Sequence, residues 1–330
     1  MTVSVRRLLG VVLLVGLPIG NCVTSFNAAA AEVWFYELRQ PPSDAVAWAR
    51  PATDADHHWA LVEFDSYPYP GQLAKLADAG NAERVSLLFK SAPAPALAAE
   101  YVELARAWKA QGIAGQLKFQ GVLPTADEAR LLRPVCDLGV KVFFISSSLP
   151  TTYEAGNLAT LKDCVEVDLA IGRYLKYGDL KDLKPLAGVQ LALVNNYFPQ
   201  YVHTDTLNLL ENPVGLHVGD ATPGEDHVAL LNTVKRLTSL FWQIDFVPDA
   251  TQYAILAKLD RSHGRRLSLR WSYGPFRVED VRAWRQLKAD RVQVSAQNFE
   301  RAELRAELRS LPGEVVVETF DLSRPGAELR

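Results

Sequence analysis

The fold of this chain is decided by a unit that residues 191–218 show most clearly, LALVNNYFPQYVHTDTLNLLENPVGLHV. The unit begins with apolar residues at every second position, Leu191 and Leu193, which is the spacing of a strand with one buried face. A polar turn and a short segment with helical spacing follow, and the alternation returns at Leu216 and Val218. The repeating unit is therefore strand, turn, short helix, turn.

The same alternation recurs along the chain at nearly constant intervals. Between the first residues of ten successive pairs the intervals are 30, 25, 25, 24, 25, 28, 23, 25 and 23 residues. Two earlier pairs, Val33 with Phe35 and Val62 with Phe64, extend the series to about twelve units of about 25 residues. No linker or shift of composition divides the 330-residue chain, so residues 32–330 are predicted to form a single α/β repeat domain. The ten pairs are Leu87 and Phe89, Leu117 and Phe119, Val142 and Phe144, Val167 and Leu169, Leu191 and Leu193, Leu216 and Val218, Ile244 and Phe246, Leu267 and Leu269, Val292 and Val294, and Val315 and Val317.

Two architectures repeat strand and helix in this way. A (β/α) TIM-type barrel closes with eight units and buries both strand faces, whereas an open solenoid takes any number of units and exposes one face. The second face of these strands is largely polar, and the count exceeds eight. We therefore expect the α/β class, as an open curved solenoid of about twelve strand–helix repeats, and keep the barrel as the alternative because a lumen can also be polar. The polar residues of that face include Gln116, Lys118, Glu166, Asp168, His217, Gln243, Asp245, Arg270 and Gln293.

Residues 183–198, LKPLAGVQLALVNNYF, resemble a leucine-rich repeat. The positions of that family's L-x-L-x-x-N-x-L core are filled here by Leu191, Leu193, Asn196 and Phe198. Weaker copies occupy residues 237–246 and 292–297. The resemblance implies an irregular, curved α/β solenoid with its strands on the concave side. Most units depart from the family at the turn-forming asparagine, where this chain has Ser147, Gly172, Ala221, Asp249, Ser272 and Gln297.

The N-terminus has the order of a secretory signal. Arg6 and Arg7 precede an apolar run of about a dozen residues, and a run of alanines at 28–31 follows. Because a membrane-spanning helix needs about 20 apolar residues, a permanent anchor is the weaker interpretation. Residues 1–31 are predicted to be a signal peptide, the mature chain to have no transmembrane segment, and the protein to be exported to a periplasm or the medium.

Charge excludes one class of partner. The chain has 35 basic and 38 acidic residues, and loss of Arg6 and Arg7 with the signal peptide changes the net charge from −3 to −5. Binding to phosphate backbones needs a surplus of clustered Lys and Arg. We therefore expect no nucleic-acid partner.

Two cysteines, Cys136 and Cys164, remain after the signal peptide is removed. An even number of cysteines in an oxidising compartment favours a disulfide, whereas buried free thiols are the alternative. Cys136 lies six residues before Val142 and Cys164 only three before Val167, so a bridge must cross an offset between adjacent units. The pair is a possible disulfide.

The sequence contains no motif that identifies a reaction. A Gly-rich phosphate loop, H-E-x-x-H, C-x-x-C and G-x-S-x-G are all absent from the sequence, and its histidines form no cluster with metal-ligand spacing beyond the adjacent His57 and His58. We therefore expect no metal, no cofactor and no catalytic residue, and favour a non-catalytic binding protein.

Stacking the strands in register places acids, an imidazole and amides in neighbouring positions of the exposed face. Such a mixed surface is typical of binding to a protein partner or to a polar ligand such as a glycan. The alternative is a face that is polar only because it meets water. The candidate binding residues are Lys118, Phe143, Asp168, His217, Asp245, Arg270 and Gln293.

The alternative function is a secreted (β/α)-barrel hydrolase that acts on carbohydrate. Glycosidases use two carboxyl groups ~5–9.5 Å apart, one protonated and one ionised. Acids at or near the ends of the predicted strands supply the candidates. The alternative catalytic carboxylates are Glu63, Asp65 and Glu318, and Asp168 and Asp245 are two further acids at or near strand ends.

Overall fold

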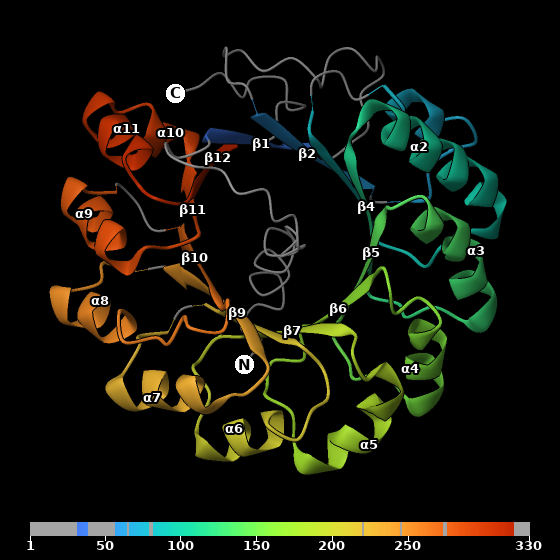
Figure 1. The fold of residues 1–330 in the computed structure, drawn as a ribbon. Coiled ribbons are helices and arrows are strands. Elements are labelled where there is room, and N and C mark those ends of the chain that lie inside the picture. The colour runs from blue at the N-terminus through green and yellow to red at the C-terminus, as the bar shows by residue number, and fades with distance from the viewer. Residues whose placement is uncertain are drawn as a thin grey trace.

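The computed structural model describes residues 32–38, 57–64, 66–78, 82–219, 221–244, 246–272 and 276–319. Strands and helices alternate along the chain, with the strands in an inner ring and the helices around it (Figure 1). The strands are β1 Glu32–Leu38, β2 His57–Phe64, β3 Arg84–Phe89, β4 Ala114–Gln120, β5 Lys141–Ser146, β6 Val165–Leu169, β7 Gln190–Asn195, β8 Val214–Val218, β9 Leu237–Ile244, β10 Arg266–Trp271, β11 Arg291–Ser295 and β12 Glu314–Thr319.

The helices that follow the strands differ in length. The α-helices are α2 Ala98–Gln111, α3 Ala126–Asp137, α4 Thr152–Ala159, α5 Leu180–Leu183, α6 Tyr201–Leu207, α7 Glu225–Thr233, α8 Ala250–Leu256, α9 Val278–Leu287, α10 Ala296–Phe299 and α11 Ala302–Arg309. Short 3₁₀ segments are η1 Leu73–Leu76, η2 Pro95–Leu97, η3 Tyr177–Asp179 and η4 Lys184–Leu186.

The sheet is parallel throughout, and each strand pairs with its neighbours in sequence. Strands β2 to β12 form one curved sheet of eleven strands. Strand β1 pairs with both of its edges, because Val33 lies opposite His57 of β2 and opposite Val316 of β12. The α/β class and the twelve strand–helix repeats are confirmed, while the edge expected to stay open is filled by β1.

Closure follows from the shape of the unit rather than from any single residue. A helix is about 10 Å wide, whereas neighbouring strands are about 4.8 Å apart, so each unit is a wedge that is wider outside than inside. Wedges joined in order bend the sheet, and here twelve of them complete a circle. The eight-stranded TIM-type ring that served as the alternative is not formed.

The main apolar core lies between the strands and the helices. The predicted apolar positions of β2 to β12 face outward into it, together with tryptophans such as Trp108, Trp242 and Trp284. Trp242 is fully buried there and its indole Nε1 donates to the Ala221 carbonyl at 2.9 Å. Trp108 of α2 packs against the backbone of Gly115 on β4, where a Cβ would collide with the indole ring. The helices are therefore held by burial on one face of the sheet.

Side-chain hydrogen bonds cap the N-termini of α3 and α8. Thr125 accepts a hydrogen bond from the Glu128 amide while the Glu128 carboxylate accepts from the Thr125 amide, a reciprocal cap for α3. Asp249 caps α8 in the same way with Gln252. Thr125 and Asp249 are therefore the N-caps of α3 and α8.

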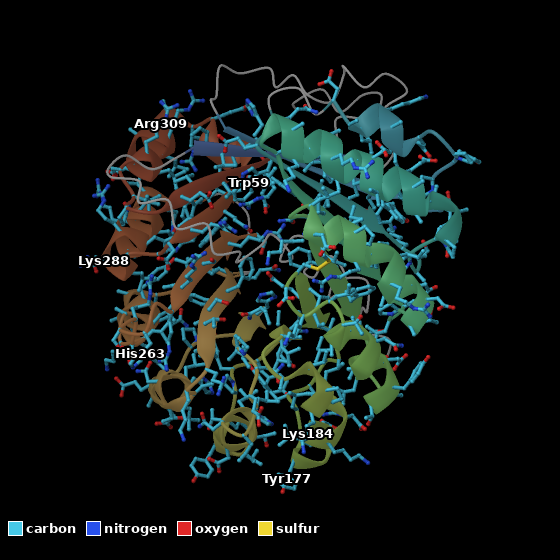
Figure 2. The ribbon with its side chains drawn as sticks, turned by 45° about the vertical axis from the view of Figure 1, so that its right-hand side comes forward. Trp59, Tyr177, Lys184, His263, Lys288 and Arg309 are labelled. Atoms are coloured by element: carbon cyan, nitrogen blue, oxygen red, sulfur yellow. A yellow bond between two sulfur atoms is a disulfide. The ribbon has the colours of Figure 1, made fainter. Side chains whose placement is uncertain are left out.

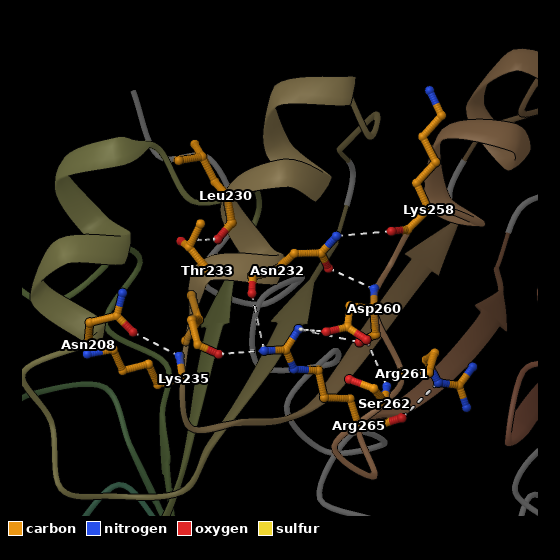
Figure 3. Close-up of polar contacts among 11 residues, drawn as sticks. Asn208, Leu230, Asn232, Thr233, Lys235, Lys258, Asp260, Arg261, Ser262 and Arg265 are labelled. Carbon is orange, nitrogen blue, oxygen red and sulfur yellow. Dashed lines mark hydrogen bonds and ion pairs between the residues drawn. The ribbon is translucent and has the colours of Figure 1, made fainter.

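Side chains between the units bind backbone groups of a neighbouring unit (Figure 3). The Asn232 amide donates to the Lys258 carbonyl at 3.0 Å, and its oxygen accepts from the Asp260 amide at 2.7 Å. Arg265, 4% exposed, donates to the Val234 carbonyl at 2.8 Å. Asn196, at the asparagine position of the resemblance, is exposed. Asparagine side chains thus link the repeats, but from other positions than the family pattern implies.

Cys136 and Cys164 are joined by a disulfide, with their Cα atoms 5.6 Å apart. Cys136 lies near the end of α3 and Cys164 directly precedes β6, so both lie near the amino ends of the strands. This shared end explains how the bridge crosses the offset between adjacent units.

None of the helices in the described part of the chain is long and apolar enough to cross a membrane. The predicted signal peptide, residues 1–31, lies outside the described residues.

Candidate functional site

The strands close into a ring, and we call the side chains that point toward its axis the lumen face. They alternate along each strand with the residues of the outer core. Part of this face is an apolar cluster. In β1 the apolar residues Val33 and Phe35 join that lumen cluster instead of the outer core, which reverses the side assigned to them by the repeat pattern. The other members of the cluster are Trp59, Leu61, Leu88, Ile145, Ala170, Val194 and Val316.

Most of the predicted binding residues lie on the lumen face, but they are not open to bulk water. Lys118 is 1% exposed, Asp168 3% and His217 2%. Phe143 and Gln293 are equally buried. The expectation of an exposed concave surface is therefore wrong, because closure of the ring turns that surface inward.

The strand pairing also differs from the register assumed in the sequence analysis, which placed Lys118, Phe143 and Asp168 at one level. Lys118 lies opposite Phe143, but Phe143 lies opposite Glu166, so Asp168 is two residues further along β6. His217 in turn lies opposite Phe241. The strands of a closed barrel are staggered, so residues at equivalent repeat positions climb around the lumen instead of sharing one level. Asp245 lies outside the described residues.

Lys118 of β4 and Glu166 and Asp168 of β6 form an ionisable group in the lumen, which we call the β4–β6 cluster. The Lys118 ammonium lies 5.2 Å from the centre of the Phe143 ring, on the strand between them. Burial lowers the pKa of Lys118 to about 7, although the charge of Asp168 opposes this shift. Burial and the neighbouring Glu166 raise the pKa of Asp168 to about 7, and burial also raises the pKa of Glu166. The lumen therefore disfavours the charged form of all three groups.

His217 on β8 is the most isolated polar side chain of the lumen. Neither imidazole nitrogen has a hydrogen-bond partner within the described part of the chain. The ring meets Phe241 edge-on at 5.7 Å between centroids, and burial lowers the pKa of His217 to about 3. The imidazole is therefore neutral at pH 7 and presents one donor and one acceptor.

Other buried polar atoms of the lumen face lack hydrogen bonds to the residues that the structure describes. They include Asp168 Oδ2, Ser239 Oγ and Gln293 Oε1. Between Asp168 and Ser239 the register places only Ala192 and Gly215, so this stretch of wall carries nothing larger than a methyl group. Buried polar groups in native proteins are nearly always hydrogen-bonded, so such a set calls for water or a ligand.

Arg270 and Glu318 form an ion pair on the lumen face. Arg270 Nε lies 3.1 Å from Glu318 Oε1, and a second guanidinium nitrogen of Arg270 donates to Gln243 at 3.2 Å. Glu63, another of the alternative catalytic carboxylates, pairs with Lys90. Since Glu318 is level with Trp59, the register puts the Cα atoms of Glu63 and Glu318 about 16 Å apart. The structure thus does not gather these alternative catalytic carboxylates, and Asp65 lies outside the described residues.

Trp59 lies between two guanidinium groups that the sequence reasoning missed. Arg84 is 3.9 Å and Arg291 4.8 Å from the centre of its ring, and Arg291 also pairs with Glu314. Arg84, Arg291 and Glu314 are the first residues of their strands, so they lie at the amino end of the lumen. We call this group the lumen floor. Its signal in the sequence is a charged residue at the start of a strand, on the polar parity.

No group of three or more His, Cys, Asp or Glu residues that could hold a metal ion is present in the described ranges. No family model, curated protein or solved structure matches the chain.

Proposed function

We propose that this protein is an exported, non-catalytic binding protein that holds a small polar ligand of the glycan class inside the lumen. The observation that carries the proposal is the set of buried polar atoms without hydrogen-bond partners among the described residues, on Asp168, His217, Ser239 and Gln293. Leaving such a group unpaired costs about 1–3 kcal/mol each, so a ligand that pairs them recovers this free energy.

The character of the lumen supports a polyhydroxylated ligand. His217 and Ser239 can both donate and accept, and Asp168 and Gln293 present acceptors, which suits hydroxyl groups. Aromatic rings lie beside them, Phe143 next to Lys118 and Phe241 next to His217. A sugar has polar edges and apolar faces, so it matches a wall in which polar groups and rings alternate.

Charge favours a neutral sugar over a strongly charged ligand. Three of the lumen's cations face acids, namely Lys90 with Glu63, Arg270 with Glu318, and Arg291 with Glu314, and burial disfavours the charged forms of both Lys118 and Asp168. Such pairing leaves little surplus charge of either sign.

The closed ring supports a small ligand over a protein partner. Lys118, Asp168 and His217 are buried, so the surface of another protein cannot reach them without opening the ring. The lumen floor occupies the amino end, and in parallel β/α rings binding sites lie at the carboxyl ends of the strands. We infer that the ligand reaches the lumen from the carboxyl end. The disulfide supports export, because such bridges persist in oxidising compartments.

The test is a thermal-shift screen of the mature chain against a panel of monosaccharides and oligosaccharides. A ligand present at 100 times its Kd adds about 2.7 kcal/mol of stability, which raises Tm by several degrees. His217→Phe keeps the ring volume and removes both nitrogens, so it should lose the shift. His263→Phe is the matched control, because His263 is exposed on the outer surface (Figure 2). A panel in which no sugar shifts the wild-type chain contradicts the proposal.

A second candidate function is a glycoside hydrolase, favoured by one observation. Glu166 and Asp168 stand two residues apart on the same face of β6, about 6.6 Å between Cα atoms. The raised pKa of Asp168 keeps part of its carboxyl protonated near pH 7, as a general acid requires. Turnover of a polysaccharide that Asp168→Asn abolishes and Asp205→Asn, at an exposed position, leaves unchanged would establish this function.

A further inference from the structure

The unit between β6 and β7 has a short, broken helix on the outside of the ring. Its α-helical part, α5, covers only Leu180–Leu183, and the 3₁₀ turns η3 and η4 precede and follow it. Pro185 lies in η4, and a proline has no N–H with which to continue an α-helix. A cavity of about 380 Å³ lies between this segment and residues 209–212, which lead from α6 to β8. We call this cavity the α5–α6 groove.

Leucines supply the apolar part of the groove. Leu183 and Leu210 are buried, whereas Leu209 is 58% exposed, so the fold itself does not cover that side chain. The volume lies within the range of about 300–1,000 Å³ that is typical of small-molecule sites. The groove can therefore hold the apolar part of a small ligand. The four leucines that line it are Leu180, Leu183, Leu209 and Leu210.

Lys181 and Lys184 give the groove a local excess of positive charge. They are three residues apart, so they lie on one side of the segment, and Lys184 and Tyr177 lie at the same part of the outer surface (Figure 2). Both lysines are exposed, and neither ammonium pairs with an acid in the described part of the chain. The acid that lines the groove is Glu211. Two cations and one carboxylate, in a chain of net charge −3, favour an anionic group on the ligand.

Asn212 adds a hydrogen-bond acceptor with a fixed orientation. It is 2% exposed, and its Nδ2 donates to the Leu186 carbonyl at 2.6 Å and to the Val189 carbonyl at 2.9 Å. These two bonds use both amide hydrogens and decide which end of the amide is the oxygen. Asn212 Oδ1 accepts no hydrogen bond from the residues that the structure describes, and Asn212 lines the groove. Its oxygen is therefore available to an N–H or O–H donor of a ligand.

We propose that the α5–α6 groove binds a small amphipathic acid of the N-acyl amino acid class. The acyl chain lies on the leucines, the carboxylate is held by Lys181 and Lys184, and the amide N–H donates to Asn212 Oδ1. A hydrocarbon would leave the lysines and Asn212 unused, and a neutral sugar would leave the lysines unpaired and the leucines uncovered. The groove lies in the helix layer, so the inference goes beyond sugar binding in the lumen and does not depend on it.

Calorimetric titration of the mature chain with N-octanoylglycine tests the carboxylate contact, and we expect one site per chain. Lys181→Gln/Lys184→Gln removes two exposed cations, and its affinity should be weaker by about ten-fold or more, because charge-assisted hydrogen bonds are the strong ones. Lys109→Gln/Lys288→Gln makes the same change of charge at exposed positions of α2 and the end of α9, and should leave the affinity unchanged.

The Asn212 contact is tested from the ligand, because Asn212 also binds two backbone carbonyls and its substitution endangers folding. N-octanoylsarcosine has N–CH₃ in place of the amide N–H and keeps the chain and the carboxylate. It should bind about five-fold more weakly than N-octanoylglycine. His217→Phe should bind N-octanoylglycine as the wild type does, so failure of this site and failure of the lumen site are distinguishable.

The inference is overturned by equal affinity in the wild type and the lysine-pair variant, by equal affinity for the two ligands, or by no binding of N-octanoylglycine. Two other occupants would overturn it as well. Sedimentation with phosphatidylglycerol vesicles that requires Lys181 and Lys184, without binding of the free acid, would assign the groove to a membrane surface. A dimer that Leu209→Asn abolishes would assign it to a second copy of this chain.

Discussion

Arg270 of β10 and Glu318 of β12 form an ion pair that reaches across β11, with 3.1 Å between Arg270 Nε and Glu318 Oε1. Their side chains are only 12% and 14% exposed, and Arg270 also binds Gln243 of β9. The Arg270 guanidinium therefore links β10 to β9 on one side and, past Gln293 of β11, to β12 on the other side, all on the lumen face.

Removal of one partner of this pair should destabilise the chain. Arg270→Ala leaves the Glu318 carboxylate partly buried and unpaired, which is expected to lower the free energy of unfolding by about 3 kcal/mol. Urea denaturation followed by circular dichroism measures this loss. The matched control is Arg130→Ala, whose partner Asp127 is 81% exposed and whose loss should cost less than about 0.5 kcal/mol. Equal losses in the two variants would show that the lumen pair is not buried.

The β4–β6 cluster predicts an unusual dependence of stability on pH. The pKa of Asp168 rises from 3.8 to about 7, so between these values the folded chain binds more protons than the unfolded chain and stability falls as pH rises. The pKa of Lys118 falls from 10.5 to about 7, so above pH 7 the unfolded chain binds more protons and stability rises with pH. The contribution of the pair therefore has its minimum near pH 7.

The measurement is the unfolding free energy from pH 4 to pH 10 for the wild-type chain and for Lys118→Met/Asp168→Asn. The unfolding free energy of the wild type minus that of the double variant should pass through a minimum near pH 7. At that pH the double variant should be at least as stable as the wild type. A maximum near pH 7, as an ordinary ion pair gives, would contradict the assignment.

The disulfide should stabilise the chain by restricting its unfolded state. Cys136 and Cys164 are 28 residues apart, and a bridge that closes a loop of this length contributes about 3.5 kcal/mol in the chain-entropy treatment. We expect Cys136→Ala/Cys164→Ala to lose about this much in urea denaturation. Added dithiothreitol should lower the wild-type midpoint and leave the double variant unchanged. An effect of reductant on both chains would point to another cause.

Two glycines should respond in opposite directions to alanine. At Gly115 a methyl group collides with the Trp108 indole, so Gly115→Ala is expected to cost about 1–3 kcal/mol. At Gly156, inside α4, a Cβ meets nothing within 4 Å, so Gly156→Ala should gain about 0.5–1 kcal/mol from helix propensity. Thermal unfolding of both variants checks the pair, and a stable Gly115→Ala chain would show that α2 packs less closely on β4.

Alternation of apolar residues was sufficient to locate the strands. Leu117 and Phe119 lie in β4, and Val292 and Val294 in β11, because a strand with one buried face repeats every second residue. The exception among the ten pairs is Phe246, which lies beyond the end of β9 at Ile244. The apolar core that holds the helices could thus be predicted from this spacing.

Relationships between the units could not be predicted in the same way. The pattern around Val33 is that of any strand, and nothing local shows that β1 meets both β2 and β12. The stagger between neighbouring strands also cannot be read from a single sequence. Lys118 and Asp168 were therefore predicted to lie at the same level, although Lys118 and Phe143 are level with Glu166. Glu166 was assigned to the polar strand face but not to the candidate binding residues, and Ser239 and Trp59 were missed, while the parity that places Asp168 and His217 on the lumen face was right.

Calorimetric titration tests most directly whether the lumen binds a sugar. The sugar that gives the largest thermal shift is titrated into the wild-type chain, His217→Phe and His263→Phe. We predict one site per chain, equal affinity in the wild type and His263→Phe, and affinity at least ten-fold weaker in His217→Phe, because the imidazole hydrogen bonds are worth about 1–3 kcal/mol. Equal affinity in all three chains, or no binding of any sugar to the wild type, would contradict the account.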